Sequence, residues 1–89
     1  MPERLLEIVN EKGLHARASA KFVEEVEQFD ARVSVARDGL EVSGDSIMGL
    51  LMLAAAKGCS IQVSAEGPDA SDALAALETL VANKFGESR

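Results

Sequence analysis

The chain has no tryptophan or tyrosine and contains only three phenylalanines, two prolines, one cysteine and one histidine among its 89 residues. A single cysteine excludes a disulfide within the chain and favours a reducing compartment. One histidine and one cysteine leave no spacing for a zinc site, so we expect neither a metal nor another cofactor. Stacking rings are absent and the formal net charge is −6, which together argue against a nucleic-acid partner.

Long apolar runs are also missing. The longest covers residues 47–56 and includes Gly49, and ten residues are too few to span a bilayer. The first residues, Met-Pro-Glu-Arg, show no signal-peptide pattern. We therefore expect a cytoplasmic protein without membrane contact, folded as one small domain over residues 1–89 and present as a monomer. The role of Cys59 is left open, although a small, half-buried packing residue is the simplest interpretation.

The only histidine lies where a helix is expected to begin. Apolar residues before it are typical of a strand, and apolar residues at helical spacing follow it. His15 thus occupies the cap region, where Ser, Thr, Asp or Asn is usual, and Arg17 follows in a first turn that disfavours cations. A phosphate held beside the ring by free backbone N–H groups and by Arg17 would explain both departures. No acidic residue lies between Lys12 and Lys21, so we expect a locally positive surface and no second carboxylate near His15.

The pattern along the chain predicts the order βαββαβα. Alternating residues predict strands at residues 4–9, 31–37, 40–42 and 60–66, with Asp38-Gly39 as a tight hairpin turn. Helical spacing predicts helices at residues 16–28 and 47–56, the second ending at Lys57 and Gly58, and a third from Asp69 to near Gly86. This order favours an α+β open-faced sandwich, a four-stranded, largely antiparallel sheet with three helices on one face.

The second predicted helix is apolar on every side. Ser46 precedes it and is expected to be its N-cap. A domain of 89 residues has too little interior to bury all sides of such a helix. Leu50, Leu53 and Ala54 are better placed for the core. We therefore expect an exposed apolar patch that fits a partner, formed by Ile47, Met48, Leu51 and Met52.

Three motifs in this order resemble the HPr family, the histidine-containing phosphocarriers of the bacterial phosphoenolpyruvate-dependent phosphotransferase system. They are Gly-Leu-His-Ala-Arg at residues 13–17, Ser-Ile-Met-Gly-Leu at residues 46–50 and Ala-Lys-Gly at residues 56–58. The resemblance spans essentially the whole chain and implies the strand order 1-4-2-3. It also implies that enzyme I passes a phosphoryl group to Nδ1 of His15, that Arg17 stabilises this group, and that a IIA-type protein then accepts it. Such a protein is a carrier and not an independent catalyst.

The resemblance implies two further properties. A dedicated HPr serine kinase/phosphorylase can modify the serine of this motif in some members, which makes Ser46 a candidate regulatory site. The first two helices of the family also dock onto successive partners. In this chain the corresponding docking residues would be Ala16, Ala20, Ile47, Met48, Leu51 and Met52.

The chain departs from the family pattern in several places. Ala18 stands where many members have proline, and Glu24 and Glu27 stand where sugar-transport members often present lysines to an acidic enzyme I. Residues 28–31 and 50–53 are similar to the nitrogen-related branch, which acts through regulation and imports no sugar. Sugar transport and nitrogen-related regulation therefore both stay open.

A different class of function is also open at this point. A βαββαβα domain can be a small ligand-sensing regulatory module that transfers no phosphoryl group. In that case the apolar helix would be a dimer interface and His15 would have no special role. Labelling by phosphoenolpyruvate and enzyme I separates the two hypotheses.

Overall fold

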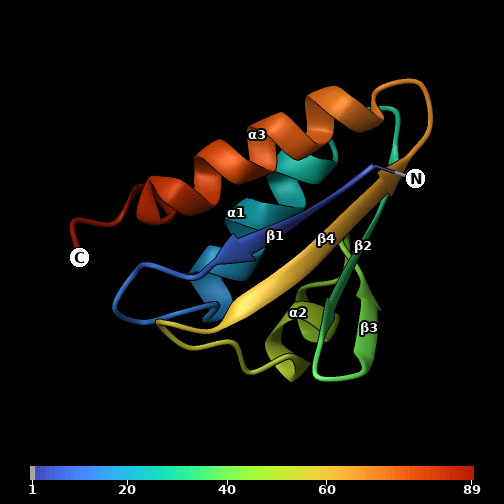
Figure 1. The fold of residues 1–89 in the computed structure, drawn as a ribbon. Coiled ribbons are helices and arrows are strands. Elements are labelled where there is room, and N and C mark those ends of the chain that lie inside the picture. Colours follow the sequence, from blue (N-terminus) through green and yellow to red (C-terminus); the bar gives the residue numbers. More distant parts are fainter. Residues whose placement is uncertain (1) are drawn as a thin grey trace.

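The computed structural model describes residues 2–89. The strands are β1 (Glu3–Glu7), β2 (Arg32–Arg37), β3 (Leu40–Ser43) and β4 (Ser60–Glu66). The helices are α1 (Ala16–Val26), α2 (Ile47–Met52) and α3 (Ala70–Ala82), followed by a short 3-10 helix, η1 (Lys84–Gly86). The predicted order βαββαβα is confirmed, with η1 as an addition (Figure 1).

The four strands form one antiparallel sheet in the order β1-β4-β2-β3, as the resemblance implied. Leu6 of β1 faces Ile61 of β4, and Val35 of β2 faces Val63 of β4. These four side chains are buried, whereas Gln62 between two of them is exposed. One face of the sheet therefore lies against the core and the other is open to solvent, which is the alternation expected of a half-buried antiparallel sheet.

The helices cover the buried face of the sheet (Figure 1). Helix α3 packs over β1 and β4, and α1 packs against both α2 and α3. The largest fully buried side chains include Phe22 from α1, Leu74 and Leu77 from α3, and Phe85 from η1. The core is thus aliphatic with two phenylalanine rings, and the predicted open-faced sandwich is confirmed.

The turn between β2 and β3 is the predicted hairpin. Asp38 and Gly39 have φ values of 52° and 84°. Two successive left-handed residues match the twist of the flanking strands, and Asp-Gly is a sequence that tolerates them.

Two predicted boundaries at the N-terminal side of the fold are wrong by two residues. Helix α1 ends at Val26 and not at residue 28, because the N–H groups of Gln28 and Phe29 bond to carbonyls three residues back and form a turn. Strand β1 ends at Glu7 and not at residue 9.

Helix α2 is shorter than predicted and ends at Met52, four residues early. Ala54 adopts a left-handed φ of 52°, so the helix cannot continue, and Lys57 and Gly58 are not its end. Ala54 is exposed, against expectation, whereas Ala55 is buried and its carbonyl accepts the N–H of Leu14 at 2.8 Å. The chain therefore turns after α2, and a hydrogen bond joins this turn to the loop that precedes α1.

Candidate functional site

His15 is the N-cap residue of α1, as predicted. Its φ and ψ are −80° and −176°, its side chain makes no capping hydrogen bond, and the first turn has no acidic residue. The N–H of Ser19 donates to the His15 carbonyl at 2.8 Å and begins the helical ladder. The N–H groups of residues 16–18 precede this ladder, so an anion beside the ring can accept hydrogen bonds from the start of α1.

The loop before His15 is held from the side of α2. Leu14 is buried, and its N–H donates to Ala55 as described above. Gly13 has a φ of 69°, and a Cβ there would lie 2.5 Å from the carbonyl oxygen of Ala55. Glycine is required here both for its backbone conformation and for the close approach of the two loops.

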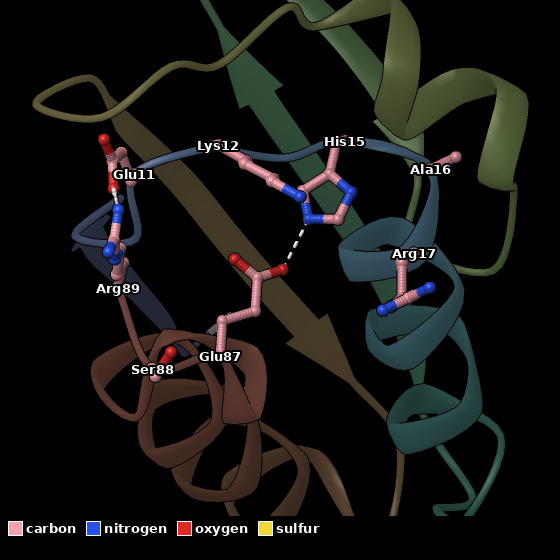
Figure 2. A pocket seen from close by; sticks show the side chains of 8 residues that line it. All are labelled: Glu11, Lys12, His15, Ala16, Arg17, Glu87, Ser88 and Arg89. Atoms are coloured by element: carbon pink, nitrogen blue, oxygen red, sulfur yellow. Dashed lines mark hydrogen bonds and ion pairs between the residues drawn. The ribbon is translucent and has the colours of Figure 1, made fainter.

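A carboxylate lies against the histidine, and this corrects the sequence-based expectation. Oε2 of Glu87 is 2.5 Å from Nε2 of His15 (Figure 2). The His15 and Glu87 side chains are 28% and 19% exposed, so water screens the pair only partly. The C-terminal segment thus contributes a group that is 72 residues away in the sequence.

Asn10 holds the other oxygen of this carboxylate. Its Nδ2 donates to Oε1 of Glu87 at 3.0 Å and to the carbonyl of Gly13 at 2.8 Å. Burial is the largest single influence on the Glu87 carboxyl and raises its pKa. The hydrogen bonds from His15 and Asn10, with the charges of His15 and Lys12, outweigh burial and leave this pKa below its ordinary value. The carboxylate is therefore ionised and can only accept hydrogen bonds.

The tautomer of a neutral His15 follows from this contact. Because the carboxylate only accepts, Nε2 must have the proton, and the lone pair is then on Nδ1. In Figure 2 this second ring nitrogen faces the start of α1, on the side of Ala16 and Arg17. The free lone pair and the free N–H groups of α1 thus lie on the same side of the ring.

Charges of both signs surround the ring. A hollow of about 750 Å³ is lined by His15 and by Glu11, Lys12, Ala16, Arg17, Glu87, Ser88 and Arg89. Arg17 is exposed and has no ion-pair partner among residues 2–89. Lys21 lies elsewhere, since its Nζ donates to the carbonyl of Phe85 at 2.7 Å. Lys12 and Arg17 lie around His15, as a locally positive surface requires, but the carboxylates of Glu11 and Glu87 lie there too.

Helix α2 lies beside the start of α1 (Figure 2). Ser46 is its N-cap, as predicted, and its Oγ accepts the N–H of Gly49 at 3.0 Å. Leu50 and Leu53 are buried as expected. The predicted patch is exposed at Ile47, Met48 and Met52, whose exposed fractions are 40%, 70% and 65%. Leu51 is half-buried.

The remaining predicted residues flank this site. Ala16 is exposed and Ala20 is half-buried on α1, whereas Ala18 is fully buried and takes part in the core. Glu24 and Glu27 are exposed at the far end of α1. Cys59 is half-buried, and Nη2 of Arg37 donates to its Sγ at 3.2 Å.

Two residues of the site, Asn10 and Glu87, were not predicted from the sequence. Glu87 stands in a polar C-terminal segment that has no periodicity, and Asn10 is one of several polar residues in a loop. Neither position has a local signal that links it to His15.

Within residues 2–89 no helix is long and apolar enough to cross a membrane.

Comparisons with known proteins agree with this arrangement. Residues 2–83 match the family model described as "PTS HPr component phosphorylation site". The phosphocarrier protein HPr of Neisseria meningitidis serogroup A is 47% identical over 87 residues, with 98% of each chain covered. The structure of HPr-C-His from Thermoanaerobacter tengcongensis matches with a TM-score of 0.95 and 40% identity over 100% of both chains. An HPr dimer from the same organism matches with a TM-score of 0.78 and 41% identity, covering 98% of this chain and 100% of that one.

Proposed function

Because the chain belongs to the HPr family of phosphocarrier proteins of the phosphotransferase system, we propose that His15 is its phosphoryl acceptor, with enzyme I as donor and a IIA-type protein as recipient. The observation that supports this proposal most strongly is the position of the ring. His15 is the only histidine, it is the N-cap residue of α1, and its Nδ1 is on the side of the ring toward the start of that helix. Such a protein works as a carrier and not as a classical catalyst.

The transfer needs few groups. The lone pair on Nδ1 attacks phosphorus as the bond between phosphorus and the donor breaks, and that electron pair stays with the donor. Arg17 and the N–H groups of residues 16–18 donate hydrogen bonds to the phosphoryl oxygens and so stabilise their negative charge. Arg17 is suited to this task because no carboxylate among residues 2–89 pairs with it. The open hollow leaves the phosphoryl group accessible to the next protein.

The exposed apolar patch on α2 and the nearby alanines of α1 form the proposed docking surface for these partners. Its residues are Ala16, Ala20, Ile47, Met48, Leu51 and Met52. Exposed methionines suit a surface that binds several partners in turn, because their side chains adapt to different shapes. Ser46 lies at the edge of this patch, where phosphorylation by an HPr serine kinase/phosphorylase would add charge next to docking residues. We propose that the protein acts in the cytoplasm, as a monomer that docks through one face.

The exposed carboxylates of Glu24 and Glu27 favour nitrogen-related regulation over sugar transport, because lysines are common there in sugar-transport members. Comparing transfer from this protein to a nitrogen-type IIA and to sugar-type IIA proteins decides between the two roles. Faster transfer to sugar-type proteins would contradict the regulatory assignment. The ligand-sensing alternative has no specific observation in its favour.

The test of the carrier function is direct. The protein is mixed with enzyme I and labelled phosphoenolpyruvate, and the adduct is examined for lability in acid and stability in base. Wild type is expected to take up the label. His15→Ala is expected to fold, since the ring is partly exposed and makes no capping bond, and to take up none. Labelling of that variant would contradict the assignment of His15.

A further inference from the structure

On the basis of the proposed function, we infer that Glu87 is a positioning residue for phosphoryl transfer. Glu87 lies in the C-terminal segment of residues 84–89, and Asn10 holds its carboxylate. This carboxylate fixes the proton on Nε2 of His15 and keeps the Nδ1 lone pair available. The tail would then be part of the transfer site and not a simple extension of α3.

The path of the tail is costly and well anchored. Lys84 and Phe85 have φ values of 58° and 55°, and a left-handed backbone is strained in residues that are not glycine. The Phe85 ring is fully buried, which holds the segment on the core. Lys21 adds a hydrogen bond to the Phe85 carbonyl. Together these contacts turn the chain back after α3 and bring Glu87 to His15.

A series of hydrogen bonds runs from the Gly13 carbonyl through Asn10 and Glu87 to the His15 ring, and its direction is fixed. The carbonyl of Gly13 can only accept, so Asn10 must present its NH2 group to it. The same NH2 group donates to Oε1 of Glu87, and the second oxygen accepts the Nε2 proton of His15. Each bond determines the next, and the series ends by selecting the histidine tautomer with a free Nδ1.

This tautomer allows transfer without moving a proton. When Nδ1 attacks phosphorus, the ring keeps its Nε2 proton and becomes cationic, and the adjacent carboxylate of Glu87 stabilises that charge. When the group moves on, the bond between Nδ1 and phosphorus breaks and its electron pair returns to Nδ1. The ring is then neutral again, with the same proton on Nε2. Acceptance and donation thus use one arrangement of hydrogen bonds.

Two substitutions of Glu87 separate this role from a purely structural one, because the two roles predict opposite orders of transfer rate for the glutamine and alanine variants. In Glu87→Gln the NH2 group of Asn10 still requires an acceptor, so the new amide oxygen turns to Asn10 and its NH2 faces Nε2 of His15. Nε2 must then accept, and the proton moves to Nδ1, which blocks attack. Glu87→Ala removes both influences and leaves the tautomers free to exchange. We therefore expect wild type to transfer fastest, the alanine variant about tenfold more slowly, and the near-isosteric glutamine variant more slowly still.

The measurements are the ring 15N chemical shifts at about pH 8.5, where an ordinary imidazole is neutral, and the rate of phosphoryl uptake from enzyme I. Glu78→Gln is the matched control, because it removes one negative charge from an exposed position on α3. It is expected to match wild type within about twofold, because this exposed carboxylate pairs with Arg4 and not with the ring, and such a surface pair contributes little. Circular dichroism confirms that each variant is folded.

The outcomes separate the role of Glu87 from the carrier function. Equal transfer rates and unchanged ring shifts in both Glu87 variants would overturn the positioning role while leaving His15 as the acceptor. A glutamine variant that transfers faster than the alanine variant would also overturn it, because shape alone would then explain the contact. Absence of label on the wild type, with enzyme I active toward a known HPr, would instead overturn the proposed function.

Discussion

The cap of α2 offers a test that separates folding from docking. Ser46 Oγ accepts the N–H of Gly49 at 3.0 Å, in a helix of only six residues. Three substitutions change this position in different ways. Ser46→Ala removes the acceptor, Ser46→Asn keeps a neutral cap, and Ser46→Asp keeps a cap and adds a negative charge.

The effect on stability follows from the lost hydrogen bond. Replacing a capping serine with alanine costs about 1 kcal/mol, which corresponds to a fall in Tm of roughly 4–8 °C for a domain of this size. Ser46→Asn and Ser46→Asp should melt within about 2 °C of wild type, because both side chains are good caps. Thermal unfolding followed by circular dichroism measures this. An alanine variant as stable as wild type would show that the cap contributes nothing to the fold.

The effect on docking depends on charge alone. The added carboxylate of Ser46→Asp lies beside Ile47 and Met48, on the proposed docking patch. One partner carboxylate at about 6 Å in water repels it by roughly 0.7 kcal/mol, or about threefold in association rate. Screening shortens the range of this repulsion to about 10 Å at 0.1 M salt and 3 Å at 1 M, so the difference should shrink as salt rises.

The assay is phosphoryl uptake from enzyme I against ionic strength, with Ser46→Asn as the neutral control. The asparagine variant is expected to match wild type at every salt concentration. If the aspartate variant also matches wild type at low salt, the surface around Ser46 is not the docking face, and the regulatory role proposed for Ser46 is wrong.

Three further predictions address the site and the loop that precedes it. Arg17→Glu should slow phosphoryl transfer by roughly tenfold or more, since charge-assisted hydrogen bonds are lost, and should leave Tm equal or slightly raised, because an acidic residue suits the first turn; wild-type rates would show that Arg17 takes no part. Gly13→Ala should lower Tm by about 8 °C or more, because a Cβ there is opposed both by the positive φ and by a backbone oxygen 2.5 Å away. Gly39→Ala is the control: its Cβ would meet nothing within 4 Å, so its Tm should fall less, by the effect of the positive φ alone, and an equal fall in both variants would refute the clash. Hydrogen bonds from His15 and Asn10 hold the pKa of the Glu87 carboxyl below its unfolded value, so this carboxyl stabilises the fold fully above about pH 4.5, and the stabilisation is lost as pH falls through the lowered pKa. The gap in Tm between wild type and Glu87→Gln should therefore close below about pH 4.5, and a gap that widens there would contradict this prediction.

Much of the fold and part of the site could be predicted from local patterns. The alternation at residues 60–66 predicted β4 with the bounds that the structure has, because one face of that strand must be buried. Asp38-Gly39 predicted its hairpin, because few residues tolerate two positive φ values in succession. Ser46 was predicted as a cap because serine is a usual N-cap residue. His15 was singled out because it stands in a cap position where Ser, Thr, Asp or Asn is usual. Such features depend on neighbours in the chain, and the sequence alone determines them.

Tertiary packing decided the rest. Alanine is the best helix former, so nothing near Ala54 predicts that α2 ends there; the helix ends because the carbonyl of Ala55 is needed by the N–H of Leu14. Lys84 and Phe85 adopt left-handed backbone only because burial of the Phe85 ring outweighs that cost. The same turn brings Glu87 to His15 across 72 residues. The sequence thus pointed to the residue that we propose as the phosphoryl acceptor, whereas long-range packing decided which nitrogen of its ring is free.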